Sequence, residues 1–399
     1  MKYDFDERVD RSGFLSSKWT DTQMWLDWHL VDHVEPDMVP FTTADMDFRC
    51  AKPIQDALRA LVEHNIYGYA APSKTNSRYY ESIRSWFRER RGWEFQEEDI
   101  FWQNGTLEAV KHAVEAFSQP GDGVLITVPG YYPFLDVIQG AGRNVIYSSL
   151  VNDGTGYYTM DYADLEEKAA RPDVKLFLFC NPNNPTGRIF TDDELRRMAE
   201  IFRRHKVVIV ADEIHGDLIR KEAQFHPLAT VAGPEGILSC TALNKTFNLA
   251  GLQATNVVVQ DPQLKKPFAA ALTSVLTINV FTAVATQAAY EGGGEWLEQL
   301  RDYLDGTIDW AMGFLKERLP RVRCRRPEGT YFLWMDFRDY GSTEEELLRR
   351  VCDGARAILE PGSWFDEEGG RGFLRMALPA PRAVVQEALE RIAAQFPGT

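Results

Sequence analysis

Residues 175–215 read KLFLFCNPNNPTGRIFTDDELRRMAEIFRRHKVVIVADEIH. The apolar runs at 175–180 and 207–212 are typical of buried strands. Between them, 191–205 has helical periodicity, a threonine cap and an acidic first turn. Strands that alternate with helices form parallel pairs, so the stretch predicts an α/β fold with a mostly parallel central sheet flanked by helices.

The same alternation extends toward the N-terminus, with strands predicted at 124–128 and 144–150 and a helix at 107–118. The uncharged segment 267–290 is long enough for a membrane span, but its seven Thr, Ser, Asn and Gln side chains favour a buried helix. After it the pattern changes, which predicts a smaller α+β domain. Its expected elements are helices at 295–319, 343–355 and 384–396 and strands at 330–337 and 373–378.

Composition excludes several classes of function. The 399 residues carry a formal net charge of -15, which repels a phosphate backbone, so we expect no nucleic-acid partner. The five cysteines include no Cys-x-x-Cys pair, which argues for a reducing compartment and against a structural metal. The charged N-terminus lacks the apolar core of a signal peptide, so we expect a cytoplasmic protein without a membrane partner.

Polar motifs follow three predicted strands, namely NPNNPTGR (181–188), ADEIH (211–215) and TALNKTFNLAGL (241–252). Ligands of parallel sheets bind at the carboxyl ends of strands. Lys245 is the only lysine of its apolar loop, and a desolvated lysine acquires a lowered pKa that suits imine formation. Asp212 ends a buried strand, where a carboxylate requires a cationic partner.

In this order and spacing the motifs resemble those of class I/II aminotransferases of pyridoxal 5'-phosphate (PLP) fold type I. The resemblance runs from ADMDF at 44–48 to GFLRMAL at 372–378. It implies a segment 1–50 that packs on the small domain, a large PLP-binding domain 51–290 and a C-terminal small domain 291–399. It also implies a homodimer with shared active sites.

The resemblance assigns roles around the cofactor ring. Lys245 is expected to hold PLP as a Schiff base and to act as the catalytic base, and Asp212 to pair with the pyridinium nitrogen. Asn184 is expected to donate to the phenolic oxygen. Tyr131 is expected to stack on the ring, with Tyr132 as the rival.

The phosphate of PLP needs donors at a helix start, and Gly105 and Thr106 precede or open the helix at 107–118. Gln253 stands where the family usually has a phosphate-binding arginine, so Thr241 and Asn244 are expected to contribute instead. A partner subunit's tyrosine commonly reaches this phosphate. Tyr69 is the nearest match, and Tyr67 is its rival.

The substrate carboxylate calls for a bidentate arginine. Arg375 matches the family's carboxylate-binding arginine, with Asn184 and the backbone near Ala44 closing the same pocket; Arg371 is a weaker candidate. His215 either tunes the phenolic oxygen or fills space as a neutral ring.

Several stretches resemble the cystathionine β-lyase-like branch, among them SSKW (16–19), PEGTYFLWMDF (327–337) and PGSW (361–364). They imply β-elimination from a cysteine S-conjugate or cystathionine-like thioether to pyruvate, ammonia and a thiol. Thr42 replaces the tryptophan of that branch, and QNGTLEAV (103–110) is typical of aminotransferases, which leaves transamination as the alternative. A catalytically silent interaction protein is the non-enzyme alternative.

Overall fold

The computed structural model describes residues 1–71, 78–272 and 278–397. Within these residues the largest sheet has seven strands in the order β2-β10-β9-β8-β7-β3-β4. Of these strands β10 alone runs opposite to the other six, which confirms the mostly parallel sheet. The strands are β2 (Ile100–Gln103), β3 (Gly123–Val128), β4 (Asn144–Ser149), β7 (Val174–Cys180), β8 (Val208–Asp212), β9 (Ile237–Ala242) and β10 (Thr255–Val258).

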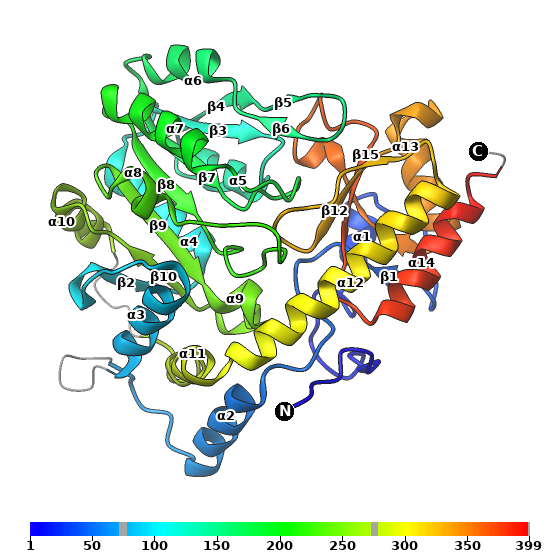
Figure 1. Ribbon diagram of the computed structural model, residues 1–399, viewed down its shortest axis with the longest axis horizontal. Helices are drawn as coiled ribbons and strands as arrows, with labels where there is room; N and C mark the ends of the chain where they lie inside the picture. Colours follow the sequence, from blue (N-terminus) through cyan, green and yellow to red (C-terminus); the bar gives the residue numbers. More distant parts are fainter. Residues whose placement is uncertain (72–77, 273–277, 398–399) are drawn as a thin grey trace.

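Helices cover both faces of this sheet (Figure 1). Alternate residues of β7 serve the two faces: Leu176 and Leu178 pack in the cluster under α4, whereas Phe177 and Phe179 pack in the cluster that includes α7. This alternation explains why the strand reads as a continuous apolar run. One face carries α4 (Thr106–Phe117), α5 (Pro133–Gly140) and α10 (Pro262–Ala271), and the other carries α6 (Tyr162–Ala169), α7 (Asp192–Arg204) and α8 (Leu228–Ala232).

A second, antiparallel sheet has the order β11-β12-β15-β14. The long helix α12 (Gly294–Arg318) runs from beside α11 toward α14 (Arg382–Ala394) and so links the two regions (Figure 1). The strands of this sheet are β11 (Arg323–Cys324), β12 (Phe332–Asp336), β14 (Glu360–Pro361) and β15 (Phe373–Ala377). The helix expected at 343–355 is an α-helix, α13 (Glu344–Leu348), continued by a π-helix over Arg349–Gly354.

The N-terminal segment packs against this second region. β1 (Val39–Pro40) pairs in parallel with β13 (Ala357–Ile358), and Trp25 of α1 (Gln23–Asp27) is buried in a cluster with Cys352. Helices α2 (Lys52–His64) and α3 (Arg78–Arg91) instead pack on α11 (Val280–Gly292), beside the large sheet (Figure 1).

The prediction of a single buried helix at 267–290 is wrong. Helix α10 ends at Ala271, after which Leu272 is extended. Helix α11 begins at Val280, after the N-cap Asn279, whose side chain accepts from the amide of Phe281 at 2.8 Å. Residues 273–277 of this segment lie outside the described residues. In the part of the chain that is described, no helix combines the length and apolarity that a bilayer crossing requires.

Candidate active site

The three sequence motifs meet at the carboxyl edge of the large sheet. Asn184 lies in the turn after β7, Asp212 is the last residue of β8, and Lys245 lies in α9 (Leu243–Thr246), directly after β9. Parallel neighbouring strands end at the same edge, so these side chains lie together at one end of the sheet.

Lys245 is held by the N-terminal segment. Its Nζ donates to the backbone oxygen of Ala44 at 2.8 Å, and the hydroxyl of Tyr331 donates to the same oxygen at 3.0 Å. Burial of the amine, with the nearby charge of Arg375, lowers the pKa of Lys245 to about 8, although Asp212 opposes this shift. A neutral, nucleophilic amine is therefore accessible near physiological pH.

Asp212 is a buried carboxylate without an ion-pair partner among the described residues. It is 3% exposed, and its Oδ1 accepts from the amide of Ile214 at 3.3 Å. Burial raises the pKa of Asp212 to about 7, opposed by that amide and by Lys245. Among the described residues no ion pair includes it, so a cationic ligand would relieve the cost of its burial.

Arg375 joins the strand-end residues to the N-terminal segment. Its Nη1 donates to Asn184 Oδ1 at 2.9 Å, and its Nη2 donates to the backbone oxygen of Thr42 at 2.8 Å. Arg375 therefore links Asn184 to the N-terminal segment that also carries Ala44. Arg371 is exposed and donates to the backbone oxygen of Glu367 at 3.1 Å, which is a surface contact.

Tyr131 and Tyr132 lie between β3 and α5 and face different surroundings. Burial raises the pKa of Tyr131, and the charge of Asp212 adds to the shift. Tyr132 packs instead edge-on against Trp364, with ring centroids 5.3 Å apart. Proximity to Asp212 favours Tyr131 over Tyr132 as the ring beside a ligand of that carboxylate.

The first turn of α4 offers backbone donors at the same edge. Gly105 precedes the helix with a φ of +122°, a conformation that favours glycine, and an added Cβ there would meet no atom within 4 Å. The hydroxyl of Thr106 is 3.0 Å from that of Thr255 on β10. This open helix start suits an anion.

The other expected phosphate ligands have partners within the chain. Thr241 Oγ1 donates to the backbone oxygen of Asn256 at 3.1 Å, and Asn244 Oδ1 accepts from the amide of Ala254 at 3.1 Å. Gln253 is exposed and has a left-handed backbone. The hydrogen bonds of Thr241 and Asn244 to the backbone of Asn256 and Ala254 could not be predicted from the sequence.

His215 and Tyr69 have opposite environments. His215 is buried, its ring packs edge-on against Tyr331 at 5.9 Å, and its Nδ1 has no hydrogen-bond partner among the described residues. Burial, followed by the charges of Lys245 and Arg375, holds the pKa of His215 well below its usual value, so the ring is neutral. Tyr69 is 95% exposed, whereas Tyr67 donates to the backbone oxygen of Val62 at 3.2 Å.

Two further residues beside Lys245 and Arg375 were not predicted from the sequence. Tyr331 supports Ala44, and Glu360 forms an ion pair with Arg375. Glu360 had a signal in the sequence, because it is the one acidic residue of the otherwise apolar run AILEPG at 357–362. Burying a carboxylate in such a run requires a partner.

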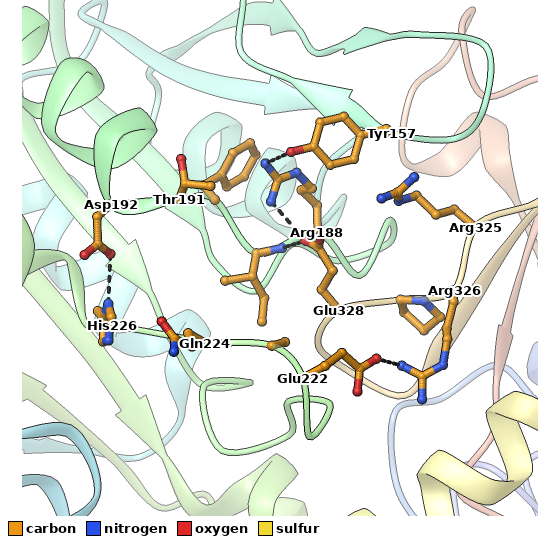
Figure 2. A pocket seen from close by; sticks show the side chains of 14 residues that line it. Tyr157, Arg188, Thr191, Asp192, Glu222, Gln224, His226, Arg325, Arg326 and Glu328 are labelled. Carbon is orange, nitrogen blue, oxygen red and sulfur yellow. Dashed lines mark hydrogen bonds and ion pairs between the residues drawn. The ribbon is translucent and has the colours of Figure 1, made fainter.

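A separate surface pocket of about 740 Å³ is lined by none of the cleft residues named above (Figure 2). Its most buried charge, Arg188, bonds to Glu328 at 2.9 Å, to Glu194 at 2.7 Å and to the hydroxyl of Tyr157. Arg188 ends the NPNNPTGR turn, so these contacts hold the turn that carries Asn184.

Comparison with known proteins identifies the family. Residues 36–392 match the model of the aminotransferase class I and II family. The chain belongs to this family. Its sequence is 35% identical to cystathionine beta-lyase PatB of Bacillus subtilis (strain 168), over 98% of this chain and 99% of PatB.

Two solved structures of the same fold are similar throughout. Cystalysin from Treponema denticola, which contains PLP, has a TM-score of 0.92 at 30% identity and covers 99% of both chains. The PLP-bound C-S lyase from Staphylococcus hominis has a TM-score of 0.91 at 29% identity and covers 100% of this chain and 99% of its own. The class I/II family membership and the fold type I architecture expected from the motifs are confirmed.

The residues of this class I/II aminotransferase family member fit PLP. The lysine amine of lowered pKa suits the aldehyde, the unpaired Asp212 suits a ring nitrogen that carries a proton, and the start of α4 suits the phosphate. The described residues contain no cluster of three or more His, Cys, Asp or Glu that could hold a metal ion.

Proposed function

We propose that this chain is a PLP-dependent carbon–sulfur β-lyase. It cleaves a cysteine S-conjugate or a cystathionine-like thioether to pyruvate, ammonia and a thiol. The observation that carries the proposal is the near full-length similarity to PatB and to two PLP-containing lyase structures, with Lys245, Asp212 and Arg375 brought into one cleft.

Each residue of the cleft has a role toward the cofactor. Lys245 would hold the aldehyde carbon of PLP, Asp212 would pair with the ring nitrogen, and Tyr131 would pack against the ring. The amide of Asn184 is free to donate to the ring oxygen because Arg375 occupies its Oδ1. The remaining cofactor-binding residues are Gly105, Thr106, His215, Thr241 and Asn244 of the same chain and Tyr69 of the partner.

When bound, PLP supplies an electron-accepting ring that stabilises negative charge at the substrate's α-carbon. Arg375 fixes the substrate by its α-carboxylate, with Asn184 and Ala44 alongside. Once the substrate's amine has displaced Lys245 from the cofactor, the freed lysine amine would remove the α-proton, and Asp212 would keep the ring nitrogen protonated. The sulfur would leave the β-carbon with its bonding electron pair and take up a proton to form the thiol, and hydrolysis of the resulting enamine by water would give pyruvate and ammonia.

Transamination is the second candidate. The family model describes aminotransferases, and the α4 turn carries the aminotransferase-like QNGTLEAV. The same four residues, Lys245, Asp212, Asn184 and Arg375, serve both reactions. The branch is chosen by whether the β-carbon carries a leaving group.

We also propose a cytoplasmic homodimer in which Tyr69 completes the neighbour's site. The exposure of Tyr69 supports this, because a single chain gives its ring little cover. We retain the division into segment 1–50, a large PLP-binding domain 51–290 and a small domain 291–399.

The test is incubation of the PLP-loaded enzyme with a panel of cysteine thioethers and no keto acid. We expect pyruvate and thiol in equal amounts over many turnovers. Absence of pyruvate from every thioether would reject the lyase assignment, and product that forms only with an added keto acid would assign an aminotransferase.

A further inference from the structure

Glu360 is a buried carboxylate at the substrate end of the cleft. It lies on β14 directly across from Arg375 on β15, and it is 3% exposed. Its Oε2 pairs with Nη2 of Arg375. The register of two paired strands therefore fixes this contact.

The ion pair uses donors that a substrate carboxylate needs. Nη2 of Arg375 already bonds to the oxygen of Thr42, and Nη1 bonds to Asn184. The guanidinium carbon lies 4.2 Å from the ring centroid of Phe332 and 4.9 Å from that of Phe365, and carboxylates bind the N–H groups around the guanidinium's edge. Nε of Arg375 has no hydrogen-bond partner among the described residues, so an entering carboxylate that binds there shares the guanidinium with Glu360 or displaces it from Nη2.

The charges around Glu360 determine how strongly it opposes a second carboxylate at Arg375. Arg375 of β15 and Lys245 of α9 are the cations that face it, and Tyr131 and Tyr132 face it from the loop before α5. Burial raises the pKa of Glu360 to about 7, against the opposing effects of Arg375 and Lys245. Above that pH two carboxylates on one guanidinium repel each other, whereas below it a protonated Glu360 does not compete.

We propose that Glu360 is a specificity-determining residue that competes with the substrate's α-carboxylate for Arg375. The enzyme therefore discriminates weakly between free amino acids and derivatives whose carboxyl group is uncharged, such as amides and esters. This rests on the proposed function only in assigning Arg375 to the substrate carboxylate.

The test compares ligand binding by the PLP-loaded wild-type enzyme and its Glu360→Gln variant. L-Alanine and L-alaninamide are titrated at pH 8, with the change in cofactor absorbance as the readout. We expect the preference for the acid over the amide to rise by about tenfold in the variant, the size of one charge-assisted hydrogen bond gained. At pH 6 the acid-to-amide preferences of the two proteins should approach each other. Because the wild type and the variant are compared at the same pH, the ionisation of each ligand's own amine cancels.

Equal acid-to-amide preferences in both proteins at pH 8 would overturn the proposal. Glu360→Leu provides a second removal of the charge and should shift the preference in the same direction. Glu344→Gln is the control, because Glu344 bonds to Ser363 outside the cleft and should leave the preference as in the wild type. Alanine has no leaving group, so this result is independent of whether thioethers are eliminated or transaminated.

Discussion

At the scale of single residues, the site depends on moving two pKa values toward neutrality by burial. Lys245 and Asp212 lie in the same cleft, and each is shifted toward its neutral form, Lys245 to about 8 and Asp212 to about 7. Perturbed groups of this kind are typical of functional sites. The two shifts prepare a nucleophilic amine beside a carboxylate that a cation would ionise.

The lowered pKa of Lys245 predicts how the cofactor-free protein takes up PLP. Only the neutral amine attacks an aldehyde, so the rate of attachment should rise with pH through about 8 and level off above it. Borohydride trapping followed by mass spectrometry measures the rate, and Lys245→Ala is the control without attachment. A midpoint near 10.5, the value of an ordinary lysine, would contradict the assignment.

Asp212→Asn should separate electrostatic from structural roles of the buried carboxylate. Without a negative charge at the ring nitrogen, we expect kcat to fall by about 100-fold or more while the fold persists. The matched control is Glu213→Gln, since Glu213 is the next residue and its Oε1 accepts from the amide of Leu228 at 2.6 Å. That variant should change thermal stability more than kcat; equal losses of kcat in both would count against the role of Asp212.

Sequence reasoning located residues that follow strands, because strand ends converge at a known edge. Lys245, Asp212 and Asn184 were predictable in this way, whereas Arg375 lies within β15 and was expected only from the family resemblance. Glu360 was not singled out, because its importance comes from a cross-strand pair with Arg375 that only the register reveals. The backbone bonds of Thr241 and Asn244 were hidden for the same reason.

At the scale of elements, a buried ionic cluster fixes the N-terminal segment beside Lys245. Lys18 is fully buried and its Nζ lies 2.8 Å from Oδ2 of Asp47, while Trp19 Nε1 and Arg11 Nη1 each lie 2.8 Å from Oδ1. Burial alone would raise the pKa of Asp47, but Lys18, Trp19 and Arg11 together hold it below its usual value. The SSKW and ADMDF stretches are thus partners in one cluster that positions Ala44.

Lys18→Met should destabilise the protein by about 3–5 kcal/mol, because it leaves Asp47 buried without its lysine. Urea titration of the free energy of unfolding measures this. The control is Lys52→Met, which removes an exposed pair with Asp56 and should have no measurable effect. The contribution of ionised Asp47 to the free energy of unfolding is fully present above its usual pKa of 3.8. It is lost as the pH falls from there through the lowered pKa of the folded state. Equal stabilities of the two variants would show that the cluster is not a source of stability.

Elements were predictable where hydrophobic periodicity and caps agree. Thr191 caps α7 and accepts from the amide of Glu194, as the sequence indicated. The prediction of one helix over 267–290 failed because the apolar residues of this segment fit one long helix, whereas Leu272 is extended and Asn279 caps a second helix. Periodicity carries no information on the π-helix that continues α13.

At the scale of the whole molecule, the proposed homodimer predicts complementation between two inactive chains. Lys245→Ala and Tyr69→Phe damage sites through different chains if Tyr69 acts in its neighbour. Statistical mixing should then restore about a quarter of the wild-type sites, one in each mixed dimer. Activity after verified subunit exchange measures this, with each variant alone as the control. Fully exchanged chains that stay inactive would place both residues in one subunit's site.

As a lyase, the enzyme releases a thiol and regains the aldehyde form of its cofactor in every turnover. The most direct measurement follows a cysteine thioether in the absence of keto acid and divides the pyruvate released by the cofactor lost to its amine form. We expect many pyruvates and an equal amount of thiol for each cofactor lost, with no acceleration by added pyruvate. One cofactor lost for each substrate consumed, with activity restored only by a keto acid, would contradict it.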